Sequence, residues 1–285
     1  MIITPEVLNE QKNDFTIIDI RSDEERQNFP LLGLDTILSS YNQNLDVAGK
    51  KVLICQFGIV TEGMIIEKKI NNTFSLLGGA QAWVEYYNEK EDLSRWARQT
   101  VLPEIGIEGQ KKLLNSHVSI IGIGGLGCPV AQSLVIAGIG KLKLIDDDIV
   151  SISNLHRQPL YSFEDVNKKK ILAAKSKLKI LNPEVIIETD DAFFDDKNGE
   201  ELLLKTDVII DATDNIKSRQ KIDKISKKLN IPTVYGALFR FEGQVSILNV
   251  DGSAGYSDLF PSSNTNDEDS CADAGVLCML PAIIG

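Results

Sequence analysis

The sequence predicts an α/β protein built from two units, each with a parallel sheet covered by helices. Short apolar stretches typical of strands alternate with stretches of helical periodicity along the 285 residues, and this alternation favours parallel sheets. A polar, charged stretch at residues 88–93 (NEKEDL) separates two such series. We therefore predict one domain at residues 1–90 and a second at residues 94–285.

The second unit is organised around a glycine-rich turn, residues 122–127 (GIGGLG), between a strand-like run at 117–121 and a helix-like run at 128–137. Glycine lets a backbone approach a phosphate closely, and the free N–H groups of a helix start attract negative charge. This spacing therefore predicts a nucleotide-phosphate site formed by Gly122, Gly124, Gly125 and Gly127. A tight turn without a ligand is the alternative.

A second strand, at residues 141–145, ends at Asp146. In a βαβ nucleotide-binding unit, an acid at this place hydrogen-bonds a ribose hydroxyl. We therefore predict that Asp146 binds the nucleotide together with the glycine turn.

Composition and charge narrow the class of protein. Hydrophobic residues make up 43% and charged residues 25% of the chain, as in ordinary globular proteins. The net charge of -11 and the pI near 4.8 argue against a general nucleic-acid or anionic-membrane surface, since either needs a basic face. No apolar run approaches the roughly 20 residues of a membrane span, and no signal peptide is recognisable. A cytoplasmic location is the simplest expectation.

The four cysteines, Cys55, Cys128, Cys271 and Cys278, form no C-x-x-C pair and no disulfide framework. In a cytosolic chain we expect reduced thiols, each either packed as a small hydrophobe or reactive. Cys128, inside a helix, and Cys278, in an apolar run, are expected to pack.

The first unit reads as three apolar strands, at residues 15–20, 51–55 and 74–77, with helices between them, one of them at 62–71. Cys55 closes the second strand, and residues 56–60 lead from it to Thr61 and a helix. A thiol in such a loop faces backbone N–H groups and a helix start, which stabilise a thiolate or persulfide anion.

These residues resemble the rhodanese family of sulfurtransferases. The resemblance rests on IDIR at 18–21, the Cys55-x-x-Gly58-x-x-Thr61 loop and LGGAQAW at 77–83, and it covers nearly all of the first ninety residues. It implies a rhodanese-like domain with a persulfide on Cys55. Rhodaneses usually carry arginines inside this loop, whereas residues 56–60 read QFGIV, so anionic sulfur donors should be recruited poorly. A rhodanese-shaped module that only docks partners is the alternative.

Polar residues follow the strands of the second unit. Residues 147–158 form a polar run, and a lysine-rich helix is predicted at 166–181. A buried strand at 207–210 leads into Asp211 and Asp214, at the edge where open α/β sheets bind ligands. Asp214 is therefore predicted to hold Mg²⁺ on the phosphates of a nucleotide. Alternatively, either acid caps the helix that begins at Asn215.

The remaining residues continue the second sheet. We predict a helix at 216–229, a strand at 233–235 and an antiparallel pair at 237–241 and 243–248. A polar loop spans 251–269, and an apolar stretch ends at Gly285.

From about Arg95 onwards the chain resembles the E1-like adenylyltransferases of the MoeB/ThiF/HesA type, which activate ubiquitin-like sulfur-carrier proteins. The resemblance implies a Rossmann-like E1 domain and ATP-dependent adenylation of the carrier's C-terminal glycine, with the molybdopterin-synthase carrier favoured over that of the thiamin pathway. The motifs that carry it are RWARQ at 95–99, the glycine turn, Asp146, SNLHRQ at 153–158, Lys170, TDN at 213–215, RFEGQ at 240–244 and CADAGV at 271–276.

The resemblance also implies roles for single residues. Arg157 and Lys170 clamp the phosphates, Arg98 reaches across a homodimer into the neighbouring site, and Cys271 can join the carrier covalently. The expected cofactors are ATP and Mg²⁺. The nucleotide-binding set is Gly122, Gly124, Gly125, Gly127, Asp146, Ser153, Asn154, Arg157, Lys170, Asp214 and Asn215.

The chemistry of these residues agrees with the resemblance. A carboxylate that attacks the α-phosphate of ATP is already ionised, so positioning and cations matter more than a general base. A persulfide on Cys55, loaded by a sulfur donor such as a cysteine desulfurase, is expected to deliver the sulfur for converting the adenylate to a thiocarboxylate.

The chain departs from these relatives at their structural zinc, because the place of the first C-x-x-C pair reads GYSD at 255–258. No zinc site is expected, and the domain is expected to be C-terminally incomplete. A nicotinamide-dependent dehydrogenase is the alternative that the glycine turn and Asp146 alone would allow. A catalytically silent E1-like docking scaffold is another.

Overall fold

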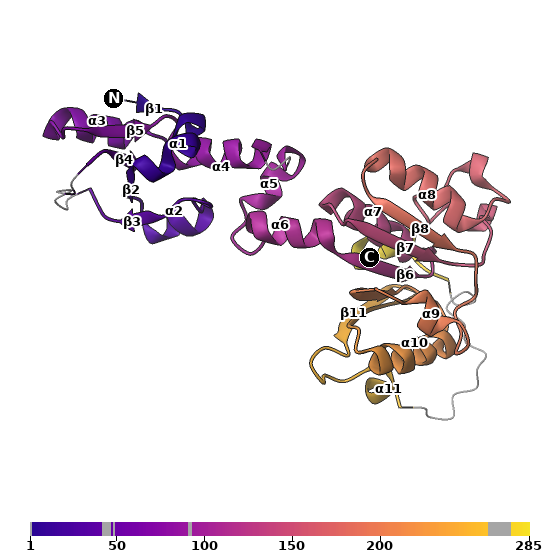
Figure 1. Cartoon of the computed structure of the whole chain (residues 1–285). Helices are drawn as coiled ribbons and strands as arrows, with labels where there is room; N and C mark the ends of the chain where they lie inside the picture. Colours follow the sequence, from indigo (N-terminus) through magenta and orange to yellow (C-terminus); the bar gives the residue numbers. More distant parts are fainter. Residues whose placement is uncertain (1, 42–46, 48, 91–92, 262–274) are drawn as a thin grey trace. The chain divides into compact units, whose positions relative to one another are not determined.

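The computed structural model describes residues 2–41, 47, 49–90, 93–261 and 275–285, which form two compact units, Met1–Lys111 and Lys112–Gly285 (Figure 1). The helices α4 (Gly79–Lys90) and α5 (Ala97–Thr100) belong to the first unit, and α6 (Gly106–Asn115) contains the division. The domain limits predicted from the sequence, 1–90 and 94–285, stay a prediction. None of the helices in the described residues has the length and apolarity that a membrane crossing requires.

The first unit is a five-stranded parallel sheet in the order β1-β5-β4-β2-β3. The predicted central strands are confirmed, whereas the two short strands at the sheet edges were not predicted. The predicted helix at 62–71 instead begins at Ile59, because Gly58 takes a positive φ of 82° that turns the chain directly into it. The remaining elements are β1 (Ile2–Ile3), α1 (Pro5–Gln11), β2 (Thr16–Asp19), α2 (Asp23–Asn28), β3 (Thr36–Leu38), β4 (Lys51–Ile54), α3 (Ile59–Lys68) and β5 (Thr73–Leu76).

The core of the first unit lies on both faces of this sheet, because neighbouring residues of a strand point to opposite sides. Ile17 and Val52 pack in one cluster with Trp83 of α4, whereas Ile18 and Leu53 pack in another with residues of α3. All five side chains are buried.

The second unit is a six-stranded sheet in the order β11-β10-β9-β6-β7-β8, parallel except for β11. The antiparallel pair predicted from the sequence is confirmed, but its first strand runs without a break through Gly236. The elements are β6 (His117–Ile121), α7 (Gly127–Ala137), β7 (Lys141–Ile145), α8 (Lys170–Leu181), β8 (Ile186–Asp190), α9 (Gly199–Leu202), β9 (Val208–Asp211), α10 (Ile216–Leu229), β10 (Thr233–Phe239), β11 (Glu242–Leu248), α11 (Tyr256–Leu259) and α13 (Leu280–Ile284).

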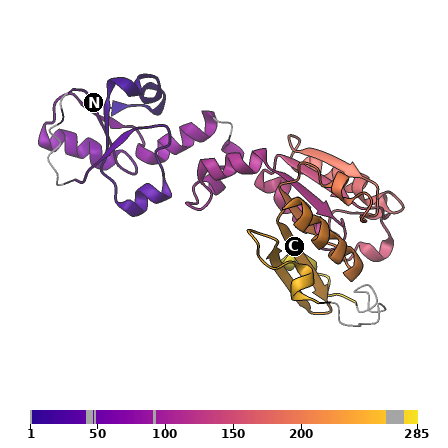
Figure 2. The same ribbon diagram turned by 60° about the horizontal axis from the view of Figure 1, so that its bottom comes forward.

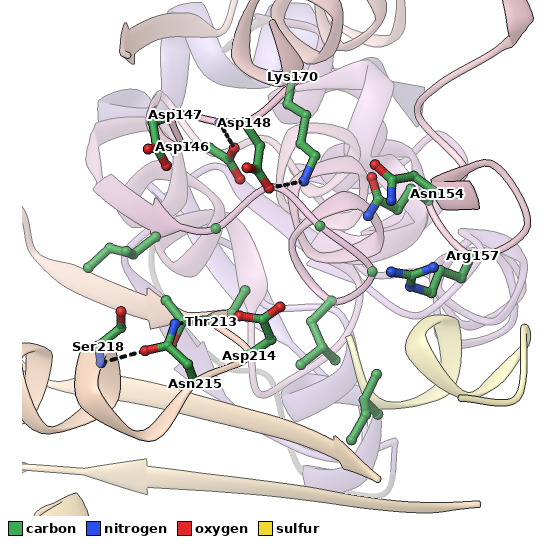
Figure 3. A pocket seen from close by; sticks show the side chains of 18 of the residues that line it. Asp146, Asp147, Asp148, Asn154, Arg157, Lys170, Thr213, Asp214, Asn215 and Ser218 are labelled. Carbon is green, nitrogen blue, oxygen red and sulfur yellow. Dashed lines mark hydrogen bonds and ion pairs between the residues drawn. The ribbon is translucent and has the colours of Figure 1, made fainter. Parts of the chain in front are cut away.

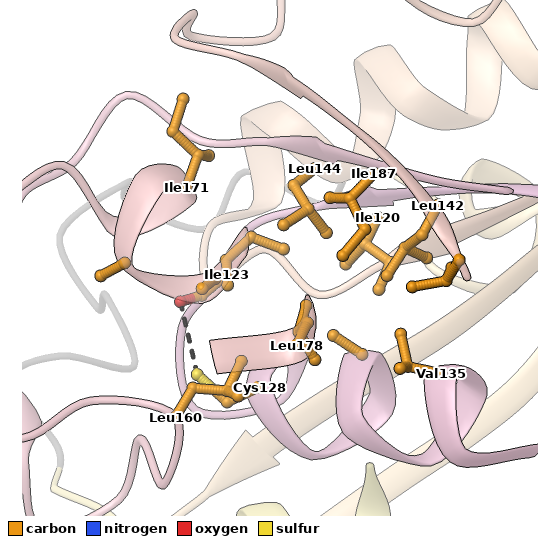
Figure 4. Close-up of a cluster of buried hydrophobic side chains, with 14 of the residues drawn as sticks. Ile120, Ile123, Cys128, Val135, Leu142, Leu144, Leu160, Ile171, Leu178 and Ile187 are labelled. Carbon is orange, nitrogen blue, oxygen red and sulfur yellow. Dashed lines mark hydrogen bonds between the residues drawn. The ribbon is translucent and has the colours of Figure 1, made fainter. Parts of the chain in front are cut away.

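Helices cover both faces of the second sheet (Figures 1 and 2). Ile120, Leu142 and Leu144 pack against α7 and α8, and Figure 4 shows this cluster with Cys128 at its end. On the other face, Ile121 and Ile145 pack against residues of α9 and α10. The strand order reverses at β6, which pairs with β7 on one side and with β9 on the other. Ligands of open α/β sheets bind at the carboxyl ends of strands beside such a reversal.

The lysine-rich helix α8 begins at Lys170, four residues later than predicted. Asn167 takes a positive φ of 69°, and Lys169 pairs with Ile149 as an isolated β-bridge, so the preceding residues are not helical. Lys170 is therefore the first residue of the helix, and not a residue of its interior as predicted.

Candidate nucleotide site

A cavity of about 840 Å³ lies at the carboxyl ends of β6, β7 and β9. It is lined by residues from the glycine turn, the segment after β7, the start of α8 and the turn after β9, and Figure 3 shows the last of these facing the acidic residues after β7. All residues of the predicted nucleotide-binding set line the cavity except Gly127. The structure therefore brings the predicted set together, and the role of each residue stays a prediction.

The glycines of the turn fall into two kinds. Gly122 has a φ of 91°, and a Cβ built on it would lie 2.9 Å from the Ala212 carbonyl oxygen. A Cβ on Gly127 would lie 2.0 Å from the Gly122 carbonyl oxygen. These two glycines shape the turn, whereas Gly124 and Gly125 line the cavity and have room for a Cβ.

Asp146 holds the glycine turn to the end of β7. Its Oδ2 accepts a hydrogen bond from the Ile123 N–H at 2.7 Å, and its Oδ1 accepts one from the Asp148 N–H at 2.9 Å. Burial raises the pKa of the Asp146 carboxyl above its ordinary value, and the opposing effect of the nearby Lys170 ammonium is smaller. Each carboxylate oxygen keeps a further lone pair, so the same side chain can still accept a bond from a ribose hydroxyl.

Three cationic side chains of the described residues line the cavity, Lys170, Arg157 and Arg219. Lys170 is 5% exposed, and its Nζ lies 2.7 Å from Oδ2 of Asp148, whose side chain is exposed. Arg157 donates from Nη1 to the Ser153 carbonyl oxygen at 2.9 Å. A buried ammonium that is neutralised by an exposed carboxylate can exchange this partner for an anionic ligand at little cost, because the carboxylate can return to water.

The turn after β9 presents an exposed carboxylate, Asp214. Asn215 caps α10 by accepting from the Ser218 N–H at 2.9 Å, so the alternative that an aspartate caps this helix is wrong. Asp211 is instead buried and accepts bonds from the N–H and hydroxyl of Thr213 at 3.0 and 2.7 Å. Asp214 thus remains available to a ligand or metal ion.

Magnesium fits this arrangement. In the described residues no three His, Cys, Asp or Glu side chains gather to form a metal site. Mg²⁺ on a nucleotide is usually held by one or two carboxylates together with phosphates and water. The exposed carboxylate of Asp214, opposite Lys170 and Arg157 in the cavity, supplies such a ligand and would hold the ion.

Several residues that line the cavity were not among the predicted site residues, and Phe193, Phe194 and Gln158 are three of them. Phe193 and Phe194 form an apolar wall, and Phe193 is 53% exposed. Gln158 is buried, and its Oε1 has no hydrogen-bond partner among the described residues. A buried acceptor without a partner indicates a donor from a ligand or water. Gln158 ends the SNLHRQ motif, which could have indicated it, whereas Phe193 and Phe194 reach the cavity through tertiary folding, which no spacing in the sequence reveals.

Known proteins share most of this unit. A model of the ThiF family matches residues 96–285. The chain belongs to the ThiF family. A sulfur carrier protein adenylyltransferase of Thermus thermophilus is 41% identical over 202 residues, which are 69% of this chain and 74% of that protein. A molybdopterin-synthase adenylyltransferase of Haemophilus influenzae is 38% identical over 203 residues, 71% of this chain and 82% of that protein.

Solved structures agree with this assignment. PaaA aligns with a TM-score of 0.55 and 30% identity over 68% of this chain. Escherichia coli MccB, in a crystal with AMPCPP and MccA, aligns with a TM-score of 0.52 and 26% identity over 62% of this chain. The chain spans 62% and 54% of the lengths of these two proteins. The expectation of a Rossmann-like, E1-like ThiF domain is confirmed, and adenylyltransferase activity on a sulfur carrier agrees with the names of the sequence relatives.

Residues 1–95 lie outside the ThiF match, so the resemblance of residues 1–90 to rhodaneses stays an expectation. Cys55 follows β4 and is buried, with its Sγ 3.3 Å from the Thr61 hydroxyl. Arg98 is an exposed residue of α5 in the first unit. The structure describes each unit separately, so the reach of Arg98 into a ThiF site stays a prediction.

The other cysteines had three different outcomes. Cys128 is fully buried, and burial raises the pKa of its thiol to about 12, so its expected packing role is confirmed. Cys278 is exposed, and its predicted packing role is wrong, because the apolar run around it places Leu280 rather than the thiol inward. Cys271 lies outside the described residues.

The place of the relatives' first zinc-binding pair forms the short helix α11. Here Asp258 accepts from the Gly255 N–H at 2.8 Å and pairs with Lys227. The absence of zinc stays a prediction.

Proposed function

We propose that the chain catalyses the ATP-dependent adenylation of the C-terminal glycine of a ubiquitin-like sulfur-carrier protein, of the molybdopterin-synthase type. The observation that carries the proposal is a cavity that joins a phosphate-type glycine turn, the cations Lys170 and Arg157, and the exposed carboxylate of Asp214. A nicotinamide-dependent dehydrogenase would need neither these two cations nor this carboxylate.

The residues of the cavity account for each part of ATP. Gly124 and Gly125 border the phosphates, and the apolar wall of Phe193 and Phe194 suits the base. Asp146 can accept a bond from the ribose. The Lys170 ammonium leaves Asp148 for the phosphates, which carry more charge.

The reaction is an in-line displacement at the α-phosphate. An oxygen of the carrier's terminal carboxylate forms a bond to the α-phosphorus, and the bond to the bridging oxygen of pyrophosphate breaks. Arg157 and Lys170 compensate the charge that spreads over the phosphate oxygens, so pyrophosphate leaves as a stabilised anion. A Mg²⁺ ion held by Asp214 would add positive charge on the same oxygens.

The first unit is proposed to be a rhodanese-like domain that supplies sulfur. Cys55 would carry a persulfide, loaded by a donor such as a cysteine desulfurase. Its position between β4 and the 10-residue helix α3 supports this role, because backbone N–H groups at a helix start stabilise an anionic sulfur.

The active form is proposed to be a homodimer in which Arg98 serves the partner's site. Mixing Arg98→Ala with Lys170→Ala should restore part of the activity, because one site of each mixed dimer has both residues. Absence of recovery, with subunit exchange verified by mass, would contradict this arrangement.

ATP–pyrophosphate exchange with a panel of molybdopterin-synthase and thiamin-pathway carriers tests the proposal. We expect carrier-dependent exchange in the presence of Mg²⁺ and no tight binding of NAD. No exchange with any carrier would favour a docking scaffold, and tight NAD binding would favour a dehydrogenase.

A further inference from the structure

Arg219 is a buried cation beside the proposed metal site. It lies in the first turn of α10, is 6% exposed and lines the cavity. Its Nη2 donates to the Thr213 carbonyl oxygen at 2.8 Å, one residue before Asp214. A charged side chain is costly to bury unless it is paired. The burial of Arg219 beside this turn therefore suggests that it has a role there.

The turn around Asp214 is fixed from three directions. Asp211 holds the N–H and hydroxyl of Thr213, Arg219 holds the carbonyl of Thr213, and Asn215 holds the first turn of α10. Asp214 is the residue between these anchors, and its own side chain is exposed. The backbone that carries the carboxylate is therefore held in place before any ligand arrives.

The guanidinium of Arg219 is itself held by aromatic rings. Its Cζ lies 5.2 Å from the centre of the Tyr235 ring. Tyr235 packs against Tyr256 of α11 at 5.3 Å and against Phe260 at 6.1 Å. Burial disfavours the charged guanidinium, but Tyr235, Asp211 and Tyr256 outweigh it and raise the pKa of Arg219.

Asp223 fixes α11 one helical turn further along α10. Its carboxylate accepts from the N–H groups of Tyr256 and Ser257 at 2.9 and 3.1 Å and from Asn249 Nδ2 at 3.0 Å. The residues that align Arg219 are thus anchored to the same helix that begins at the proposed metal site.

We propose that Arg219 is a positioning residue that sets the Thr213–Asp214–Asn215 turn for the metal bound with ATP. The inference rests on the proposed function and adds a residue to which that function assigns no role. Arginine suits this position because its planar group can donate in a fixed direction and stack on a ring at the same time, which lysine cannot do.

Calorimetric titration with AMPCPP, with and without Mg²⁺, tests this role apart from turnover. In Arg219→Lys we expect the affinity with Mg²⁺ to fall at least about tenfold, as for other residues that orient a metal ligand, and the affinity without Mg²⁺ to stay unchanged. Arg219→Met should show a larger loss of the same kind. Lys228→Met, on the exposed side of α10 and paired with Glu200, is the matched control and should bind as the wild type does.

Leu178→Ala controls for general destabilisation, because Leu178 is buried in the core cluster on the other face of the sheet. An equal loss in Arg219→Lys with and without Mg²⁺ would show a direct nucleotide contact and overturn the positioning role. Unchanged affinities in Arg219→Lys and Arg219→Met would also overturn it. If the wild type bound no AMPCPP, the proposed function itself would fail instead.

Discussion

Two loops of the molecule have the same local plan and different surroundings. The Cys55 loop joins β4 to α3, and the glycine turn joins β6 to α7, each at the carboxyl end of a buried parallel strand. Both contain a glycine of positive φ, Gly58 at 82° and Gly122 at 91°. In the first loop, the hydroxyls of Thr61 and Ser75 both donate to the Gly58 carbonyl oxygen. The second loop borders a cavity of about 840 Å³.

The comparison shows what a strand-to-helix loop needs in order to hold a thiol of the chain, and what it needs in order to admit a nucleotide. A loop whose carbonyl is held by neighbouring hydroxyls can fix a thiol that is part of the chain. A loop that borders open space, with charged groups at its rim, can admit a ligand. Local sequence places both loops, and the surrounding side chains give each its chemical character.

The largest effect is expected from Lys170→Ala, which removes a cation from the open loop. Pyrophosphate exchange should fall about 100-fold or more, because transition-state charge is left uncompensated. Lys168→Ala is the matched control, since that nearby lysine is exposed and pairs with Asp165, and neither residue lines the cavity. Equal rates for Lys170→Ala and the control would remove Lys170 from the proposed mechanism.

Glycine substitutions separate the parts of each loop that shape the backbone from those that border space. Gly127→Ala should lower the free energy of unfolding by about 3 kcal/mol, because the new Cβ meets the Gly122 carbonyl. Gly79→Ala should cost the first unit a similar amount, since its Cβ would lie 2.3 Å from the Cys55 carbonyl oxygen. Gly125→Ala should leave stability within about 0.5 kcal/mol while weakening ATP binding. Urea denaturation and calorimetry would measure both quantities.

A pH series compares the support that the charged Asp223 gives to α11 of the second unit with the neutral hydrogen bonds of the Cys55 loop. Burial favours a higher pKa for Asp223, but hydrogen bonds from Asn249, Ser257 and Tyr256 outweigh it and lower the pKa. Its stabilisation is therefore fully present above the ordinary Asp pKa of about 3.9 and is lost as the pH falls through the lower folded-state value.

Asp223→Asn should accordingly cost about 2 kcal/mol of unfolding free energy at neutral pH, and the difference from the wild type should shrink in acid. Thr61→Val in the neutral Cys55 loop should show a pH-independent cost. Asp196→Asn, at an exposed pair with Lys224, is the control and should change little at any pH. A constant difference for Asp223→Asn down to acid pH would contradict the assigned role of its charge.

Sequence reasoning located the buried strands and the glycine turn, because apolar runs and glycine spacing are local signals. It missed Arg219 and Phe193, which reach the cavity only once the sheet order brings α10 and the segment after β8 beside the glycine turn. It also placed Lys170 within a helix that in fact begins there, since a positive φ at Asn167 leaves no strong local signal. Cys278 was wrongly predicted to be buried, because an apolar run does not indicate which of its residues faces inward.

The smallest effect on adenylation is expected from Cys55→Ala, which alters only the Cys55 loop. Pyrophosphate exchange should stay at the wild-type rate, while transfer of sulfur to the carrier is lost. Mass spectrometry after treatment with a persulfide donor should find the added sulfur on Cys55. If Cys55 stays unmodified under donors that load an ordinary rhodanese, the first unit is a docking module.

Intact-mass spectrometry of the carrier tests the central proposal most directly. With the wild-type chain, ATP and Mg²⁺, at least one ubiquitin-like sulfur carrier should gain the mass of an adenylate on its C-terminal glycine, and Lys170→Ala should give none. Unmodified carriers throughout the panel, under conditions in which the wild-type chain binds ATP, would contradict the assignment of this cavity to adenylation.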